Sequence, residues 1–199
     1  MRDKNYYKKY IDSFLKQNSM VNLVSKNDAN LLFEKHISDS LAIEKFFEKH
    51  IKNTRGLKLL DIGTGGGFPA VPTAITYPEI EVFALDSIRK KINAIENIKN
   101  DLDIKNLHTI CERAENITEK YDIITSRAVS SLKVISNYAL PLLKNDGYFI
   151  AYKSIRTEEE INDAKPILKK YKSEIIDLIE YQLPLLENYT RKLVIIKRQ

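Results

Sequence analysis

The spacing of the hydrophobic positions in this chain changes near residue 57. Before it, apolar residues recur at helical spacing, in one stripe over the first eighteen residues and again from about Asp28, the expected N-cap, to His50. From Leu57 onward, short apolar runs alternate with longer amphipathic stretches, which is typical of strands and helices alternating around a parallel sheet. We therefore divide the chain into an N-terminal helical extension, residues 1–56, and an α/β domain, residues 57–199.

The individual runs predict five parallel strands with helices between them. The expected strands are Leu57–Ile62, Glu81–Leu85, Leu107–Cys111, Asp122–Thr125 and Tyr148–Lys153. The expected helices are Phe68–Tyr77, Ser87–Leu102, Val129–Leu143 and Thr157–Tyr171. Two more apolar runs, Ile175–Tyr181 and Leu193–Lys197, are separated only by a loop, so we expect them to pair antiparallel. The sequence thus predicts a mixed seven-stranded sheet whose last strand is antiparallel.

Composition and charge narrow the function classes. No apolar run is long enough to span a bilayer, the first residues do not resemble a signal peptide, and Cys111 has no cysteine to pair with, so we expect a cytoplasmic protein. The scattered histidines and the single cysteine predict no metal site. The net charge of +5 is concentrated in residues 1–56, which carry eleven lysines and arginines against seven acidic residues. This excess either attracts a phosphate-bearing partner or simply solvates the helices.

A glycine-rich turn is the strongest functional signal. The chain has only six glycines, and four of them fall within residues 63–67, after the first predicted strand and before a helix. Glycine lets the backbone turn sharply and approach a ligand, and the following helix offers free N–H groups. This arrangement predicts a nucleotide-cofactor site.

Two classes of cofactor use such a turn. Read from Gly65 to Ala70, the turn also fits the dinucleotide pattern, which leaves a nicotinamide-dependent oxidoreductase as an alternative. Three features argue against the oxidoreductase. Asp61 is placed to face a cationic or hydroxylated ligand, no second domain is obvious, and the closing antiparallel strands do not belong to the usual dinucleotide-binding topology. We therefore favour a methyltransferase that uses S-adenosylmethionine. A non-catalytic RNA-binding module on the same fold is the second alternative.

Polar residues follow the other predicted strands. Asp86 ends the second strand, where a carboxylate can accept hydrogen bonds from both ribose hydroxyls or, with Ser87, cap the next helix. The segment 112–115 follows the third strand, where an adenine ring would lie. Arg127 follows the fourth strand; it would hold a phosphate or the cofactor carboxylate, or else form an ordinary ion pair. Lys153 follows the fifth strand and either contacts the substrate or is solvated.

Several motifs occur together in a family-specific order. DIGTGGGFPAVP is followed by LDSIRKK, ERAE, SRAVSSL and AYKS, and is preceded by NLVS and HISDS. In this order they closely resemble the RsmG/GidB family of bacterial methyltransferases, which transfer a methyl group from S-adenosylmethionine to N7 of a guanine in 16S ribosomal RNA. The resemblance implies a Rossmann-like class I fold, and a monomer whose partner is 16S ribosomal RNA or the small ribosomal subunit.

The resemblance also implies roles for individual residues. Together with the position arguments above, it gives the expected cofactor contacts Asp61, Gly63, Gly65, Phe68, Asp86, Ser87, Ala114, Glu115 and Arg127. It suggests Arg127 and Lys153 as catalytic residues, and Asn22, His36, Arg113 and Arg191 as substrate contacts, with a capping or core histidine as the alternative for His36. Ala70 departs from the family, which usually has glycine there. No general base is expected, because N7 of neutral guanine already has a free lone pair.

Overall fold

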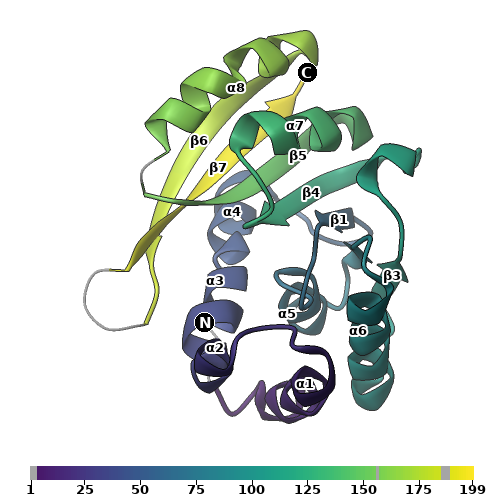
Figure 1. Ribbon diagram of the computed structural model, residues 1–199. Coiled ribbons are helices and arrows are strands. Elements are labelled where there is room, and N and C mark those ends of the chain that lie inside the picture. Colours follow the sequence, from purple (N-terminus) through teal and green to yellow (C-terminus); the bar gives the residue numbers. More distant parts are fainter. Residues whose placement is uncertain (1–3, 156, 185–188) are drawn as a thin grey trace.

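The computed structural model describes residues 4–155, 157–184 and 189–199, and it is built around one mixed sheet (Figure 1). Its strands are β1 (Lys58–Ile62), β2 (Glu81–Leu85), β3 (Leu107–Ile110), β4 (Tyr121–Arg127), β5 (Leu143–Ser154), β6 (Ser173–Gln182) and β7 (Thr190–Arg198). They lie in the order β3-β2-β1-β4-β5-β7-β6, and β7 runs antiparallel to both of its neighbours. The predicted mixed sheet with an antiparallel last strand is confirmed.

Helices cover both faces of the sheet. They are α1 (Lys8–Val21), α2 (Lys26–Asn30), the π-helical turn η1 (Leu32–Ile37), α3 (Ser38–Ser40), α4 (Ile43–His50), α5 (Ala70–Thr76), α6 (Arg89–Leu102), the 3₁₀ turns η2 (Ala114–Asn116) and η3 (Leu140–Leu142), α7 (Leu132–Ala139) and α8 (Glu158–Lys170). Figure 1 shows α7 and α8 on one side of the sheet and α1, α5 and α6 on the other. None of the helices in the described ranges is long and apolar enough to cross a membrane.

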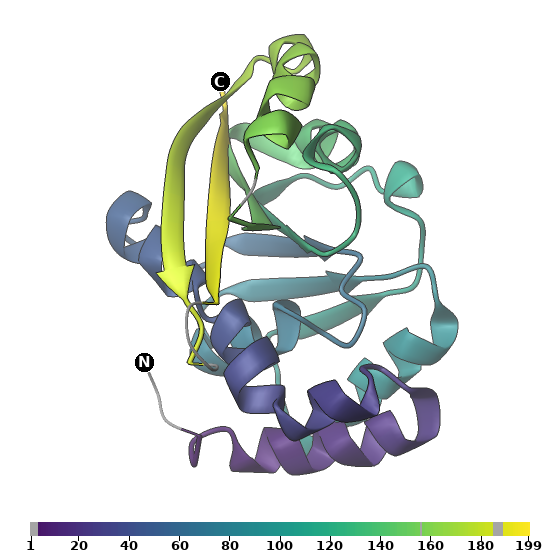
Figure 2. The same ribbon diagram turned by 60° about the vertical axis from the view of Figure 1, so that its left-hand side comes forward.

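The N-terminal helices share a hydrophobic core with the sheet. Tyr7, Tyr10 and Phe14, in or just before α1, are at most 2% exposed and belong to the same core as α5, α6 and the inner strands. In Figure 2 the N-terminal helix α1, drawn in purple, lies below the sheet at the bottom of the molecule. A second core lies under α7 and α8. The extension is therefore positioned rigidly against the sheet by buried aromatic side chains.

The structure corrects two details of the predicted helices. The helical region after the first break is capped by Ser25, whose Oγ accepts a hydrogen bond from the Asp28 N–H at 3.1 Å, and not by Asp28 itself. The helix expected from Val129 starts only at Leu132, because Ser131 directly before it has an extended backbone, with φ −61° and ψ 156°. An extended residue cannot form part of an α-helix, so the helix can begin only after it.

The topology brings all the candidate strand ends to one edge. β1 pairs in parallel with both β2 and β4, so the chain order of the strands reverses between β1 and β4. Ligands of such sheets bind outside the carboxyl ends of the strands, at the point of reversal. The glycine turn follows β1 directly.

Candidate active site

A cavity of about 460 Å³ lies at this edge of the sheet. It is bordered by the glycine turn, by the segments after β2 and β3, and by the loop after β4. Six residues singled out in the sequence meet there: Gly63, Asp86, Ser87, Arg113, Ala114 and Glu115. Arg113, expected to contact the substrate, thus lies with the expected cofactor residues.

The glycine turn has a conformation that other residues rarely adopt. Gly63 has a φ of +70° and Gly65 a φ of +58°. A Cβ on Gly63 would lie 2.6 Å from Cγ2 of Val129, so the missing side chain lets the turn and the loop after β4 approach each other. The N–H groups of Gly63 and Thr64 both donate to the carbonyl of Leu85, each at 2.9 Å, which fixes the turn to the end of β2.

Asp86 joins the glycine turn to the start of α6. Its Oδ2 accepts a hydrogen bond from the Gly65 N–H at 3.0 Å, and its Oδ1 accepts one from the Ile88 N–H at 2.9 Å. Each carboxylate oxygen has a second lone pair. The side chain, in a residue only 8% exposed, therefore holds the turn and still has acceptor capacity for ribose hydroxyls facing the cavity.

Apolar side chains form the walls of the cavity. Ile88 is 41% exposed and Val129 46% exposed, yet both line the cavity together with Ile62 and Leu85. Exposed aliphatic side chains across a pocket favour a flat aromatic ligand such as an adenine ring. A glycine cradle, a carboxylate with spare acceptors and apolar walls together fit S-adenosylmethionine. Ile88 and Val129 were not singled out from the sequence, although they lie in the motifs LDSIRKK and SRAVSSL, because an isolated aliphatic residue in a loop forms no pattern.

Asp61 lies behind the turn, within the sheet. It is fully buried, and its Oδ1 accepts a hydrogen bond from the hydroxyl of Thr125 on the neighbouring β4 at 2.9 Å. Burial raises the pKa of this carboxyl to about 6, although the hydrogen bond from Thr125 and the charge of Arg127 oppose the shift. Its side chain ties β1 to β4 beneath the cavity.

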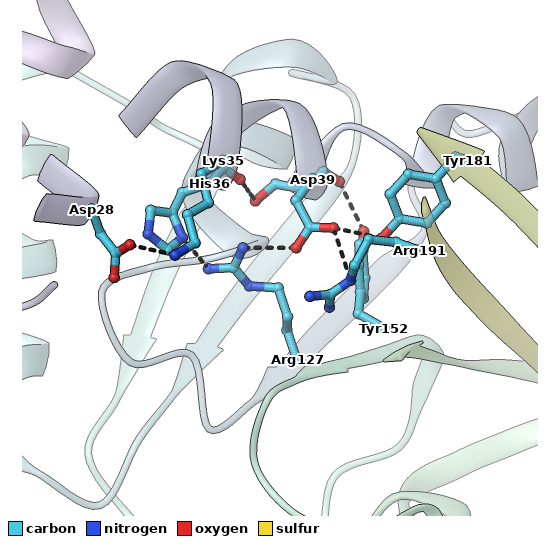
Figure 3. Close-up of polar contacts among 9 residues, drawn as sticks. Asp28, Lys35, His36, Asp39, Arg127, Tyr152, Tyr181 and Arg191 are labelled. Carbon is cyan, nitrogen blue, oxygen red and sulfur yellow. Dashed lines mark hydrogen bonds and ion pairs between the residues drawn. The ribbon is translucent and has the colours of Figure 1, made fainter. Parts of the chain in front are cut away.

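A second group of functional candidates gathers around Asp39, which the sequence analysis did not select (Figure 3). This carboxylate is 1% exposed; its Oδ2 accepts a hydrogen bond from Nη1 of Arg127 at 2.9 Å, and its Oδ1 accepts one from the hydroxyl of Tyr181. Nε of Arg191 lies 3.7 Å from Oδ1. Arg127 and Arg191, far apart in the sequence, thus meet at one buried acid from the N-terminal extension. Its position three residues after His36, in HISDS, was the available signal.

His36 and Phe68 belong to the same cluster. Nδ1 of His36 accepts a hydrogen bond from Nη2 of Arg127 at 3.1 Å, and its ring stacks on that of Phe68 at 5.1 Å between centroids. The Arg127 guanidinium carbon lies 5.0 Å from the Phe68 ring centroid. Burial, followed by the charge of Arg127, lowers the pKa of His36 to about 4, so the ring is neutral at pH 7 with its proton on Nε2.

The remaining candidates, Lys153 and Asn22, form hydrogen bonds within the protein. Lys153 donates to the carbonyl of Ser130 and to the carboxylate of Glu160, each at 2.7 Å. Asn22 ends α1 with a φ of +53°, and its N–H donates to the carbonyl of Asn18 at 3.0 Å. The next residue, Leu23, packs on the glycine turn, since a Cβ on Gly66 would lie 3.4 Å from the Cβ of Leu23. The extension therefore reaches the rim of the site.

Comparison with known proteins identifies the family. The family model for GidB, described as rRNA small subunit methyltransferase G, matches residues 3–194. The chain belongs to this family. It is 37% identical over 199 residues to the ribosomal RNA small subunit methyltransferase G of Thermoanaerobacter sp. (strain X514), covering 97% of this chain and 81% of the relative. It is also 37% identical over 180 residues to the protein of that name from Desulfitobacterium hafniense (strain Y51), covering 87% of this chain and 72% of the relative.

Solved methyltransferase structures share the fold. TrmN from Thermus thermophilus superposes with a TM-score of 0.61 at 16% identity, covering 80% of this chain and 48% of that one. An rRNA methylase from Streptococcus thermophilus gives a TM-score of 0.54 at 16% identity, covering 80% and 96%. As a member of the GidB family, this protein is a methyltransferase with S-adenosylmethionine as its methyl donor, and the nicotinamide alternative is excluded.

Proposed function

We propose that this enzyme transfers the methyl group of S-adenosylmethionine to N7 of one guanine in the 16S ribosomal RNA of the small subunit. The proposal rests on the cavity where the glycine turn and Asp86 meet, in a chain that the family model matches over residues 3–194. The names of the relatives support a ribosomal RNA substrate. The guanine and its N7 position rest on the motif resemblance described above.

Residues of the cavity described above would hold the cofactor. Gly63 and its neighbours would cradle the amino-acid part, Asp86 would accept hydrogen bonds from the ribose, and Ala114 and Glu115 would border the adenine between the apolar walls. When bound, S-adenosylmethionine supplies an activated methyl group. The chain contributes position and the exclusion of water, an effect that can be worth about 7–11 kcal/mol.

No proton has to be removed from guanine N7 before it attacks. Two buried titratable groups close to the glycine turn, Asp61 and His36, agree with this scheme. Asp61 is enclosed by the sheet, and His36 already accepts a hydrogen bond from Arg127 at the nitrogen that would take up a proton. The charge of Arg127 is directed at Asp39, which spares the positively charged sulfonium a facing cation.

The N-terminal extension is the proposed RNA-facing element. Its Asn22 precedes Leu23, which packs on the glycine turn, and its His36 stacks on Phe68 just after that turn. Helix α1 also carries exposed lysines such as Lys8, Lys9 and Lys16. Arg191 would contribute from β7. We also propose that the enzyme acts in the cytoplasm, as a monomer, and without a metal ion.

The test is methyl transfer from labelled S-adenosylmethionine to 16S RNA, and separately to small subunits, from cells that lack this protein. We expect a single N7-methylated guanine, located by mapping the modified base. Methylation at another guanine atom would refute the N7 assignment. Cofactor binding without transfer to either RNA sample would refute the substrate.

A further inference from the structure

The loop that joins β4 to α7, residues 128–131, forms one side of the cofactor cavity. Its Ala128 and Val129 line the cavity, and Val129 faces the glycine turn at Gly63. The left-handed backbone of Ala128 is uncommon for a residue with a side chain, so surrounding contacts must stabilise this conformation. The loop has little apolar burial of its own to do this, since Val129 and Ser130 are not buried.

Glu160, in α8, lies where the loop enters α7. Its Oε2 accepts a hydrogen bond from the N–H of Leu132, the first residue of α7, at 2.7 Å. The same oxygen accepts one from Nζ of Lys153 at 2.7 Å. A carboxylate at this position also stabilises the N-terminal end of the helix dipole. Figure 1 shows α7 and α8 lying side by side, which brings Glu160 to this point.

Lys153 extends the contact into the loop itself. Its Nζ donates to the carbonyl of Ser130 at 2.7 Å, and its side chain is only 11% exposed. One carboxylate and one ammonium therefore hold the loop at Ser130 and at Leu132, on both sides of Ser131. Hydrogen bonds between such charged groups are shorter and stronger than neutral ones.

We propose that Glu160 is a positioning residue of the cofactor site. Together with Lys153 it forms a latch that fixes residues 128–131 and thereby holds Val129 against the cavity. Without the latch, the cofactor would have to order the loop when it binds, which weakens affinity. This inference rests on the proposed function only in taking the cavity as the site of S-adenosylmethionine.

The test compares Glu160→Ala with Glu159→Ala, since Glu159 is the exposed neighbour on the same helix. Calorimetric titration with S-adenosylhomocysteine, well below the melting temperature, should show affinity about tenfold weaker for Glu160→Ala and within about twofold of the unchanged protein for Glu159→Ala. Hydrogen exchange at the Leu132 amide should be faster in Glu160→Ala. Unchanged affinity in the folded Glu160→Ala protein would overturn the proposal. It would mean that Glu160 only stabilises the packing of α7 against α8, since such a contact would lower the melting temperature without changing the affinity.

A double-variant cycle tests whether the two residues act together. Lys153→Ala should weaken binding as well, and the double variant should be much less impaired than the sum of the two effects. Additive losses would overturn the latch. If Glu160→Ala does not fold, Glu160→Gln, which keeps one acceptor oxygen, should bind with intermediate affinity; affinity equal to that of the unchanged protein would again refute the idea. The titration contains no RNA, so failure of RNA methylation in the unchanged protein counts only against the proposed substrate.

Discussion

Replacing Gly63 by alanine separates the backbone role of the glycine turn from its role in the cavity. Gly63 has a φ of +70°, and Gly56, in the turn before β1, has a φ of +76°. A non-glycine residue in this region costs about 1–2 kcal/mol. A Cβ on Gly56 would meet nothing within 4 Å, whereas one on Gly63 would lie 2.6 Å from Cγ2 of Val129. The two substitutions therefore share a backbone cost and differ at the cavity.

The free energy of unfolding should fall by about 1–2 kcal/mol in both variants, which lowers the melting temperature by roughly 2–8 °C for a chain of this size. Saturating S-adenosylhomocysteine, at about 100 times its dissociation constant, stabilises a folded protein by about 2.7 kcal/mol. Gly56→Ala should retain this stabilisation. Gly63→Ala should lose about half of it, since displacing Val129 to make room for the Cβ narrows the cavity and a tenfold weaker affinity removes about 1.4 kcal/mol.

Thermal shift with and without S-adenosylhomocysteine measures both effects in one experiment. The difference between the two variants in the ligand-induced shift is the decisive quantity. Equal ligand-induced shifts in Gly56→Ala and Gly63→Ala would refute the reasoning, because the turn would then tolerate a side chain at the cavity.

Three further predictions concern the charged groups. Asp86→Ala should weaken binding of S-adenosylhomocysteine in calorimetric titration and lower the free energy of unfolding by about 1–3 kcal/mol, because two backbone N–H groups lose their acceptor. Arg127→Ala should cost up to about 3–5 kcal/mol in urea unfolding by removing the closer of the two arginines that face the buried Asp39, and adding Asp39→Asn should recover part of that loss; additive losses would contradict the pairing. The pKa of His36 is lowered to about 4, so the unfolded chain binds more protons than the folded protein between pH 6.5 and 4, and the stability contribution of the neutral ring is lost as the pH falls through this window. His36→Asn should therefore lose less stability than the unchanged protein on acidification from pH 6.5. The raised pKa of Asp61 acts in the opposite direction, but it does so in both proteins. Identical dependence of stability on pH in the two proteins would contradict the assignment.

The sequence predicted best what depends on local pattern. The order of strands and helices follows from hydrophobic spacing, and the glycine turn and Asp86 were found because each immediately follows an apolar strand. Hydrophobic spacing does not determine which strands become neighbours in the sheet. For β6 and β7, the short loop between them was enough to predict antiparallel pairing. The register of that pair is interrupted between Ile175 and Asp177, which no sequence pattern indicated.

Contacts between distant segments were not predictable in the same way. For Arg127 the sequence left open both a ligand contact and an ordinary ion pair, and it could not name Asp39, which lies 88 positions earlier in the chain. Glu160 appeared as one of three consecutive glutamates at the start of a helix, and only the packing of α8 against α7 distinguishes it. Ion-pair partners set by tertiary packing leave no periodic signal in one sequence.

The strand order also has a consequence for synthesis on the ribosome. β6 precedes β7 in the chain, yet among the described residues it joins the sheet only through hydrogen bonds to β7. Chains emerge from the ribosome N-terminal end first. β6 therefore leaves the exit tunnel before β7, the strand with which it pairs. The sheet is complete only when β7 inserts between β5 and β6. Until then the outer edge of β5 is an open template, and a nascent chain stalled before residue 190 would expose it to pairing with other chains.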